Sequence, residues 1–448
     1  MCALACVALS GLATGDEIRV RTVMLTGPRG TDPMREPNVA VDPNDPDNIV
    51  ATGLSRSRSA AYAYYWTSRD GLRTWTRGFL KPWKPHFDIA SDPSLAYGPD
   101  CRVYYTHLDF GDFQKARGLK DGDWLSEGGL GFQRSEDCGK TFTPSRIAGN
   151  PSDHLQADKD WIAVDASSSG QYRGSVYVFW SFIGSLVDKS DTATDIQFAY
   201  SRDGKTFSAP RQLSKSGYVV ATSVRPDGTL DAIWEERRWD SQKIWHVTSS
   251  DGGETFSPPA LVVAVAKEVV LDWPVLTATP GGSLVAAWCQ RGRDFSHRFE
   301  SEVFTSASKD GSWSQPRPLE PDPAPGAWTS IPSLAATDGA VWLLAYHADA
   351  KQTQVVLYRA ARDTDRFEKD VVLAARRFGV SQFCPGWLDC FEEEPQPKAK
   401  TQDEQFSPGD YVGLSGAKGR VVAAYILPRK DDRRVSRQPT LYVSVVRE

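Results

Sequence analysis

The chain has 448 residues, of which 40% are hydrophobic, 24% charged and 11% aromatic, a globular composition that excludes a disordered chain. Its formal net charge is −5, from 52 basic and 57 acidic residues with no basic block, which excludes nucleic acid as an expected partner. No apolar run reaches the about 18–20 residues that a spanning helix needs, so no transmembrane span is predicted.

The first 15 residues form the most apolar stretch of the chain. They have the apolar core and small-residue exit of a secretory signal, with Gly11-Leu12-Ala13 as the cleavage site, although no positively charged leader precedes them. Cys6 follows Ala-Leu-Ala, which is similar to a lipoprotein box. We therefore predict a secreted or periplasmic protein, with lipid anchoring and an ordinary frayed terminus as the alternatives.

From the next residues onward, the chain repeats a strand–turn–strand unit. Equivalent positions are 37, 93, 160, 220, 274, 332 and 412, which are 56, 67, 60, 54, 58 and 80 residues apart. Each unit contains a second apolar strand, such as Val176–Trp180 or Leu284–Trp288. The 36 glycines and 29 prolines supply turns between these strands. Short strands at such intervals predict an all-β fold of radial or sandwich type.

A second hairpin recurs with the pattern S-x-D-x-G-x-T-[F/W]. The aspartate can accept backbone N–H bonds within a tight turn, glycine takes the positive-φ position, and the aromatic residue packs between sheets. We therefore assign these side chains a structural role. The pattern is matched in full by Ser135–Phe142 and Ser249–Phe256. Near matches are Ser68–Trp75 and Ser201–Phe207, and weaker versions are Ser308–Trp313 and Arg362–Phe367.

This pattern resembles the Asp-box, or BNR repeat, of the sialidase-type β-propellers, and the resemblance extends over nearly the whole chain. It implies four-stranded blades around an axis. We predict seven blades, with six as the alternative, in one domain spanning residues 16–448 with a loop insertion at about 376–409. The strand Glu17–Met24 completes the last blade beside Pro439–Val446, which removes two free sheet edges. Catalytic sialidases resemble six-bladed propellers, so a seventh blade departs from that pattern.

The cysteines fit an exported protein. Blade phasing brings the turn of Cys101 next to the Asp-box turn of Cys138, and we predict a disulfide between them. Cys384 and Cys390 flank a short loop and are close enough to bridge. Cys289 lies in an apolar strand and is interpreted as a buried hydrophobe.

In a propeller, first-strand starts and second-strand exits lie on one face, opposite the Asp-box turns. Ionisable and aromatic residues gather at these positions. The first-strand starts offer Arg35, Glu36, Asp92, Lys159, Asp160, Asp272, Trp273, Asp410 and Tyr411, and the second-strand exits offer Arg56, His107, Asp109, Glu235, Glu236, Arg237, Arg238, Gln290, Arg291, Tyr346, His347 and Arg429.

The sialidase resemblance implies an arginine triad on a sugar carboxylate, a tyrosine nucleophile with a glutamate partner, and an aspartate acid/base. Met34–Pro37 resembles the family's Arg-x-Pro motif, and Asp410–Leu414 resembles its tyrosine segment. The stretch Ser55–Tyr62 departs from the family because it has no aspartate, and no third-blade glycine-rich motif is found. The candidate catalytic residues are Tyr411, Glu235, Glu236 and Asp92, with Glu235 or Glu236 as the partner of Tyr411, and the candidate substrate-binding residues are Arg35, Arg237, Arg291, Arg429, His107 and His347.

The resulting prediction is a monomeric glycoside hydrolase of sialidase type that acts on an acidic, sialic-acid-type glycan without a cofactor. One alternative is a non-catalytic propeller that binds a glycan or a protein. Another is a lyase of a uronate polymer, with histidine or tyrosine as base and arginine on the carboxylate. Two structural alternatives stay open. Lys159 and Asp160 can serve only to fix the start of a strand, and Glu235–Arg238 can form solvated ion pairs that contribute little. Asp42–Asn48 offers oxygen ligands for Ca²⁺, or a proline turn alone.

Overall fold

The computed structural model describes residues 20–26, 33–56, 61–81, 89–110, 128–147, 156–183, 194–237, 241–292, 301–321, 323, 326–378, 406–429 and 439–448. The predicted leader, the bridge between Cys384 and Cys390, and most of the predicted insertion lie outside these residues. Among the described residues none is helical, and none belongs to a helix long and apolar enough to cross a membrane.

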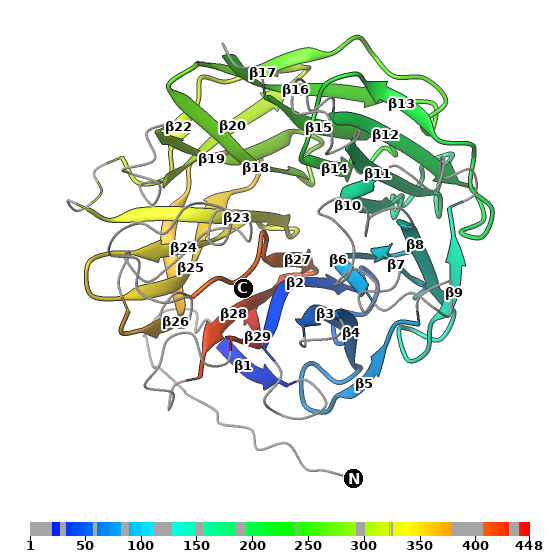
Figure 1. Ribbon diagram of the computed structural model, residues 1–448, viewed down its shortest axis with the longest axis horizontal. Coiled ribbons are helices and arrows are strands. Elements are labelled where there is room, and N and C mark those ends of the chain that lie inside the picture. Colours follow the sequence, from blue (N-terminus) through cyan, green and yellow to red (C-terminus); the bar gives the residue numbers. More distant parts are fainter. Residues whose placement is uncertain are drawn as a thin grey trace, which may run out of the picture.

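The described strands form a β-propeller of seven antiparallel blades around a central axis (Figure 1). One single-residue bridge, between β4 and β6, joins blades 1 and 2. The first four blades comprise β2 (Met34–Val41), β3 (Ile49–Arg56), β4 (Ala61–Ser68) and β5 (Thr76–Phe79); β6 (Ile89–Tyr97), β7 (Val103–Phe110), β8 (Gly128–Ser135) and β9 (Thr143–Arg146); β10 (Gln156–Val164), β11 (Val176–Ile183), β12 (Thr194–Ser201) and β13 (Arg211–Ser214); and β14 (Val220–Val224), β15 (Leu230–Arg237), β16 (Ser241–Ser249) and β17 (Ala260–Ala266).

The last three blades follow in the same order, and the fourth strand of blade 5 is divided in two. They comprise β18 (Val269–Ala278), β19 (Leu284–Gly292), β20 (Ser301–Lys309), β21 (Ser312–Trp313) and β22 (Arg317–Pro318); β23 (Trp328–Ala336), β24 (Ala340–Ala348), β25 (Thr353–Ala361) and β26 (Glu368–Arg376); and β27 (Gly413–Ala417), β28 (Arg420–Pro428), β29 (Pro439–Arg447) and β1 (Val20–Leu25).

The N-terminal strand closes the ring. β1 pairs antiparallel with β29, in a register that runs from Val20 opposite Val446 to Leu25 opposite Leu441. Figure 1 shows this blue strand beside the red C-terminal strands. The predicted closure and the seven-blade count are therefore confirmed. Two sheet edges that would otherwise stay open are satisfied by this pairing.

Large aromatic side chains fill the space between the blades. The fifth residues of β11, β15 and β19 are Trp180, Trp234 and Trp288, and each is at most 1% exposed. The recurrence follows from the repeat, because each blade must cover the face of the next with a comparable side chain. Burial of so large a ring contributes about 1.5–3 kcal/mol per side chain.

The recurring serine and aspartate build the same turn after β4, β8, β12 and β16; we call these the Ser–Asp turns. In the last of them, Ser249 Oγ donates to Asp251 Oδ1 at 2.8 Å, and the backbone N–H of Thr255 donates to the same oxygen at 2.9 Å. Gly252 and Gly253 take positive φ angles of 69° and 89°. Burial by itself would raise the pKa of Asp251, but hydrogen bonds from Thr255 and Ser249 outweigh it and lower the pKa to about 2.

A disulfide joins two turns of blade 2. Cys101, between β6 and β7, is bonded to Cys138 in the Ser–Asp turn after β8, with their Cα atoms 5.0 Å apart. The predicted pairing is confirmed. Cys289 is a buried free cysteine on β19, as the sequence indicated.

Candidate functional site

The innermost strands of five blades share a β-bulge, and in each the bulged residue has a left-handed backbone. At this point two residues of the inner strand face a single residue of its partner, so the pairing register shifts by one residue. The first of the two is not glycine, although its left-handed φ is unfavourable for other residues. Strain of about 1–3 kcal/mol at one residue persists only where the surroundings enforce it, and it is concentrated at functional sites. The bulged residues are Glu36, Asp92, Lys159, Trp273 and Ile331, with φ between 49° and 56°.

The segment before β27 takes the corresponding place in blade 7. The carbonyl of Pro408 accepts a hydrogen bond of 2.9 Å from the backbone N–H of Glu36. A Cβ atom at Gly409, where φ is 96°, would lie 2.7 Å from that same nitrogen. Only glycine allows the chain to approach β2 so closely, and this approach places Asp410 and Tyr411 at the axis.

The ammonium group of Lys159 joins three carboxylates from different parts of the chain. Its Nζ atom is 2.7 Å from Asp410 Oδ2, 3.1 Å from Asp92 Oδ2 and 3.6 Å from Asp158 Oδ1. The side chains of Lys159, Asp92 and Asp410 are all less than a tenth exposed. Burial alone would lower the pKa of Lys159, but the three carboxylates outweigh it and hold the pKa well above its ordinary value. Lys159 therefore stays charged.

Two further buried carboxyl groups act on this centre, and with Lys159 and its three partners they form what we call the axial cluster. Burial, with Asp92 and Asp410 nearby, raises the pKa of Glu36 well above its ordinary value. Burial does the same for Asp160, with Asp92 adding to it. For Asp92, burial outweighs the attraction of Lys159 and raises the pKa to about 6. Burial at the axis therefore favours the protonated forms of Glu36 and Asp160, and Asp92, with a pKa of about 6, titrates close to neutral pH.

Tyr411 lies against this cluster at the wall of a narrow axial cavity. Its hydroxyl donates to the carbonyl of Pro93 at 3.3 Å, and its ring meets that of Trp161 edge-on, with centroids 6.0 Å apart. Burial, together with Asp92 and Glu36, raises the pKa of its hydroxyl well above the ordinary value. Tyr411 is therefore a neutral phenol that needs a base before it can act as a nucleophile.

The axial cavity is mostly apolar and holds about 30 Å³ of free space, roughly the volume of one water molecule. The ring of Trp273 forms part of its wall, 5.5 Å from Lys159 Nζ. Val220, Pro274 and Pro332 line it as well. A ligand at this position would meet aromatic and aliphatic surface beside the charged groups of the axial cluster.

The arginines expected around the axis lie in different places. Arg35 donates from Nη1 to the carbonyl of Ser407 at 3.0 Å, and its charge lowers the pKa of Glu36 against the stronger effect of burial. Arg291 donates to Asp272 Oδ2 at 2.6 Å and lines a second, outer cavity. Arg429 follows β28 and is half-buried. The side chain of Arg237 lies outside the described part of the structure. Of the four, Arg35 adjoins the axial cluster.

The two histidines also lie away from the axial cavity. His107 is 1% exposed inside blade 2, where its Nδ1 is 3.0 Å from Asp109 Oδ1 and its Nε2 is 3.2 Å from the amide nitrogen of Gln133. His347 Nδ1 is 3.2 Å from Glu320 Oε1, beside the outer cavity. Their geometry fits fixed structural contacts better than binding of a ligand at the axis.

Of the predicted catalytic residues, Tyr411 and Asp92 come together, whereas Glu235 and Glu236 occupy blade 4. Glu235 is fully buried on β15. Glu236 accepts a 2.6 Å hydrogen bond from the indole of Trp245. The carboxyl groups that act on Tyr411 are instead those of Asp92, Glu36 and Asp160.

Sequence reasoning underrated Lys159 and missed Glu36 as a partner of Tyr411. The available signal was the repeat itself, because both residues occupy the same position of the first strand as Asp92. The outer cavity, with Glu302 and Glu320, was also missed, since neither residue belongs to a recurring position.

The acidic turn considered for Ca²⁺ uses its oxygens within the turn. Asp42 Oδ1 accepts the backbone N–H of Asn44 at 2.8 Å, and Asp42 Oδ2 accepts the amide of Asn48 at 3.2 Å. Within the described ranges, no group of three or more His, Cys, Asp or Glu side chains is arranged to hold a metal ion.

No protein-family model and no curated protein sequence matches the chain. Among solved structures, the chain is similar to a protein of unknown function from Dyadobacter fermentans, with a TM-score of 0.50, 15% identity, and coverage of 96% of this chain and 99% of that one. A PL25 ulvan lyase bound to -[GlcA(1-4)Rha3S]- is similar with a TM-score of 0.52 and 9% identity, over 90% of this chain and 93% of that one. The Hadza microbial sialidase Hz136 aligns over 88% and 73%, with a TM-score of 0.45 and 14% identity. At these identities the likeness concerns the fold alone.

Proposed function

We propose that this protein is a glycan-cleaving hydrolase of sialidase type, with its active site at the axial cluster. The observation that carries the proposal is the placement of Tyr411 against buried carboxyl groups of unequal proton affinity, next to Asp92 with its pKa of about 6. A site with a phenol, an acid and a base within one buried cluster has the parts that glycoside cleavage through a tyrosine nucleophile needs.

The roles follow from the protonation states. Burial favours the proton on Glu36, which can donate it to the leaving oxygen, whereas Asp92, with its pKa of about 6, can accept the proton of Tyr411 in its ionised form. The phenolate oxygen forms a bond to the anomeric carbon as the glycosidic bond breaks. Water then cleaves this covalent link, with its proton taken up by Glu36 and the phenol proton restored from Asp92.

The substrate class rests on Arg35 and the aromatic wall. A guanidinium group beside the cluster can bind the carboxylate of an acidic sugar. The axial cavity of about 30 Å³ is smaller than a sugar ring, so on this proposal its wall opens on binding and brings the rings of Trp161 and Trp273 against the sugar. The Ser–Asp turns are, on this proposal, Asp-boxes, and the protein acts on extracellular glycans after export.

The test is hydrolysis of a fluorogenic sialoside by the purified chain. Tyr411→Phe removes the nucleophile and should lower kcat at least about 100-fold without loss of ligand affinity. Tyr442→Phe is the matched control, because Tyr442 lies on β29 and stacks on Tyr425 away from the axis. Absence of turnover by the unaltered chain, or equal turnover by the Tyr411 variant, would contradict the proposal.

A uronate lyase is the second candidate. Its support is the fold likeness to an ulvan lyase, at a TM-score of 0.52. Protonated Glu36 and Asp160 could neutralise a uronate carboxylate by hydrogen bonding, and a nearby base could remove the adjacent C–H proton. Release of unsaturated, ultraviolet-absorbing sugars from a uronate polymer would favour the lyase over the hydrolase. Binding without either product would indicate a non-catalytic propeller.

A further inference from the structure

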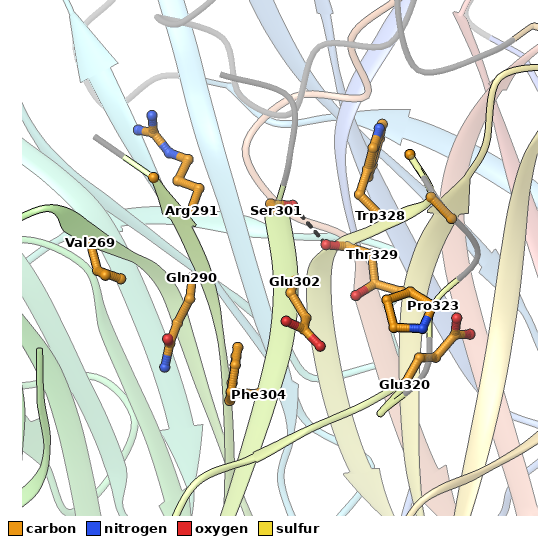
Figure 2. A pocket seen from close by; sticks show the side chains of 13 residues that line it. Val269, Gln290, Arg291, Ser301, Glu302, Phe304, Glu320, Pro323, Trp328 and Thr329 are labelled. Carbon is orange, nitrogen blue, oxygen red and sulfur yellow. Dashed lines mark hydrogen bonds between the residues drawn. The ribbon is translucent and has the colours of Figure 1, made fainter. Parts of the chain in front are cut away.

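A second cavity, of about 450 Å³, opens between blades 5 and 6 (Figure 2). Its volume lies within the about 300–1,000 Å³ of small-molecule sites. Its walls are formed by residues from the end of β19, the start of β20 and the start of β23. The side chains used below are Gln290, Arg291, Glu302, Phe304, Glu320 and Trp328.

Hydrogen-bonding groups line one wall of this cavity side by side. Gln290 on β19 and Glu302 on β20 are directly opposite each other in the strand register, so the amide and the carboxyl lie next to one another. Glu320 faces them from the chain after β22 and is fixed by Tyr358, whose hydroxyl donates to Oε1 at 2.6 Å, and by His347 at 3.2 Å. Figure 2 shows Glu302 between Gln290 and Glu320.

Aromatic surface accompanies these polar groups. Phe304 lies two residues after Glu302 on β20 and therefore points to the same side of the sheet. Trp328, at the start of β23, closes the other side. Aromatic faces combined with a few carboxyl and amide groups match the alternation of C–H faces and hydroxyl edges on a sugar ring.

The charge of the cavity excludes an acidic ligand. The guanidinium of Arg291 is paired with Asp272 at 2.6 Å, which leaves Glu320 as the main charge facing the cavity. Burial, together with Glu320, raises the pKa of Glu302, so this carboxyl resists ionisation and can act as a hydrogen-bond donor. The hydrogen bond from His347, together with that from Tyr358, lowers the pKa of Glu320, so a ligand carboxylate would meet the negative charge of Glu320. Hydroxyl groups would find both donors and acceptors.

We propose that the cavity between blades 5 and 6 is a binding site for an uncharged, hydroxyl-rich saccharide of one to three sugar units. This site is independent of cleavage at the axis. Arg291 in the wall of this cavity forms an ion pair with Asp272, and the next residue, Trp273, lies in the wall of the axial cavity.

The test is calorimetric titration with maltotriose, cellotriose, xylotriose and mannotriose, and with trigalacturonic acid as the charged probe. We expect at least one uncharged trisaccharide to bind and the charged one not to bind. Gln290→Ala and Glu302→Ala should each weaken that binding about tenfold, which corresponds to about 1.4 kcal/mol. Glu302→Gln should retain it, because an amide can still donate and accept hydrogen bonds.

Glu268→Ala is the matched control, since Glu268 is 67% exposed at the turn between β17 and β18. Titration of the Tyr411→Phe variant separates this proposal from the axial one, because binding in the outer cavity should be unchanged there. The proposal would be overturned if all four uncharged trisaccharides failed to bind, or if the charged probe bound more tightly than they do. It would also be overturned if Gln290→Ala and Glu302→Ala bound the trisaccharide as tightly as the original chain.

Discussion

Aspartates of the Ser–Asp turns and aspartates of the axial cluster show how differently one molecule treats the same side chain. In the turns, Asp251 and Asp203 accept several backbone and hydroxyl hydrogen bonds, and each pKa is lowered to about 2. At the axis, burial raises the pKa of Asp92 to about 6 and that of Asp160 well above its ordinary value. The turns therefore stabilise the charged form of their aspartates, whereas burial at the axis favours the protonated form of Asp92 and Asp160.

The difference teaches where to look for chemistry in a repeated fold. A carboxylate whose acceptors are all filled by its own turn has no capacity left for a substrate. Burial and like-charged neighbours raise the pKa of a carboxyl group towards the pH at which an enzyme works. Both kinds occur at recurring positions of the blade, so recurrence alone does not distinguish them.

The strongest way to break the comparison is to remove the cation of the axial cluster. Lys159→Met leaves Asp92 and Asp410 buried without their counter-charge and should lower the free energy of unfolding at pH 7 by about 3–5 kcal/mol. Urea denaturation measures this loss, and lowering the pH should recover part of it as the carboxyl groups become protonated. Lys267→Met, at a 65% exposed lysine, should have no measurable effect. Equal stability of the two variants would show that Lys159 does not hold the cluster together.

A smaller effect is expected from the turns. Asp251→Ala removes the acceptor for Ser249 and Thr255 and should lower the free energy of unfolding by about 1–2 kcal/mol. Turnover and glycan binding should stay unchanged, because this turn lies on the opposite face from the axial cluster. Chemical denaturation together with the sialoside assay checks both halves of this expectation. Loss of activity with a normal stability would place chemistry at the turns and contradict the account.

The most gradual expected effect is a difference in pH dependence. The pKa of Asp92 is raised, so its proton stabilises the folded state at low pH, and this contribution is lost as the pH rises from 3.8 towards 6. The pKa of Asp251 is lowered, so its contribution is complete above 3.8 and is lost as the pH falls towards 2. Unfolding is therefore measured from pH 2 to pH 7. The stability difference between the original chain and Asp92→Asn should fall as the pH rises, whereas the difference between the original chain and Asp251→Asn should rise, each with a slope below about 1.4 kcal/mol per pH unit. Parallel curves for all three would argue against unequal environments.

The fold could be predicted from sequence because its determinants are local and repeated. The spacing of strands and turns predicted seven blades. The N-terminal strand belongs to no repeat unit of its own, which predicted that β1 closes the last blade. The pairing of Cys101 with Cys138 followed from the same phasing. Each of these inferences requires only the order of strands and turns along the chain.

The site could be predicted only in part, because its contacts join blades that are far apart in sequence. Tyr411 and Asp92 were found from their positions, but nothing in the sequence gives the approach of Asp410 to Lys159 across 251 residues. The bulges that turn Glu36 and Asp92 into left-handed conformations depend on packing around the axis. The recurring position before a proline marks where they occur but does not give their backbone angles. Arg291 has a local partner, Asp272, that holds it beside the outer cavity.

The most direct test of the account is infrared spectroscopy of the carboxyl groups at pH 7. Protonated carboxylic acids absorb separately from carboxylates, so buried acids of the axial cluster should give a carbonyl band that the exposed turns do not. Glu36→Gln and Asp160→Asn should each remove part of this band, whereas Asp251→Asn should leave it unchanged. Absence of the band at pH 7, or its loss only in the Asp251 variant, would contradict the claim that the axis stores protons for chemistry.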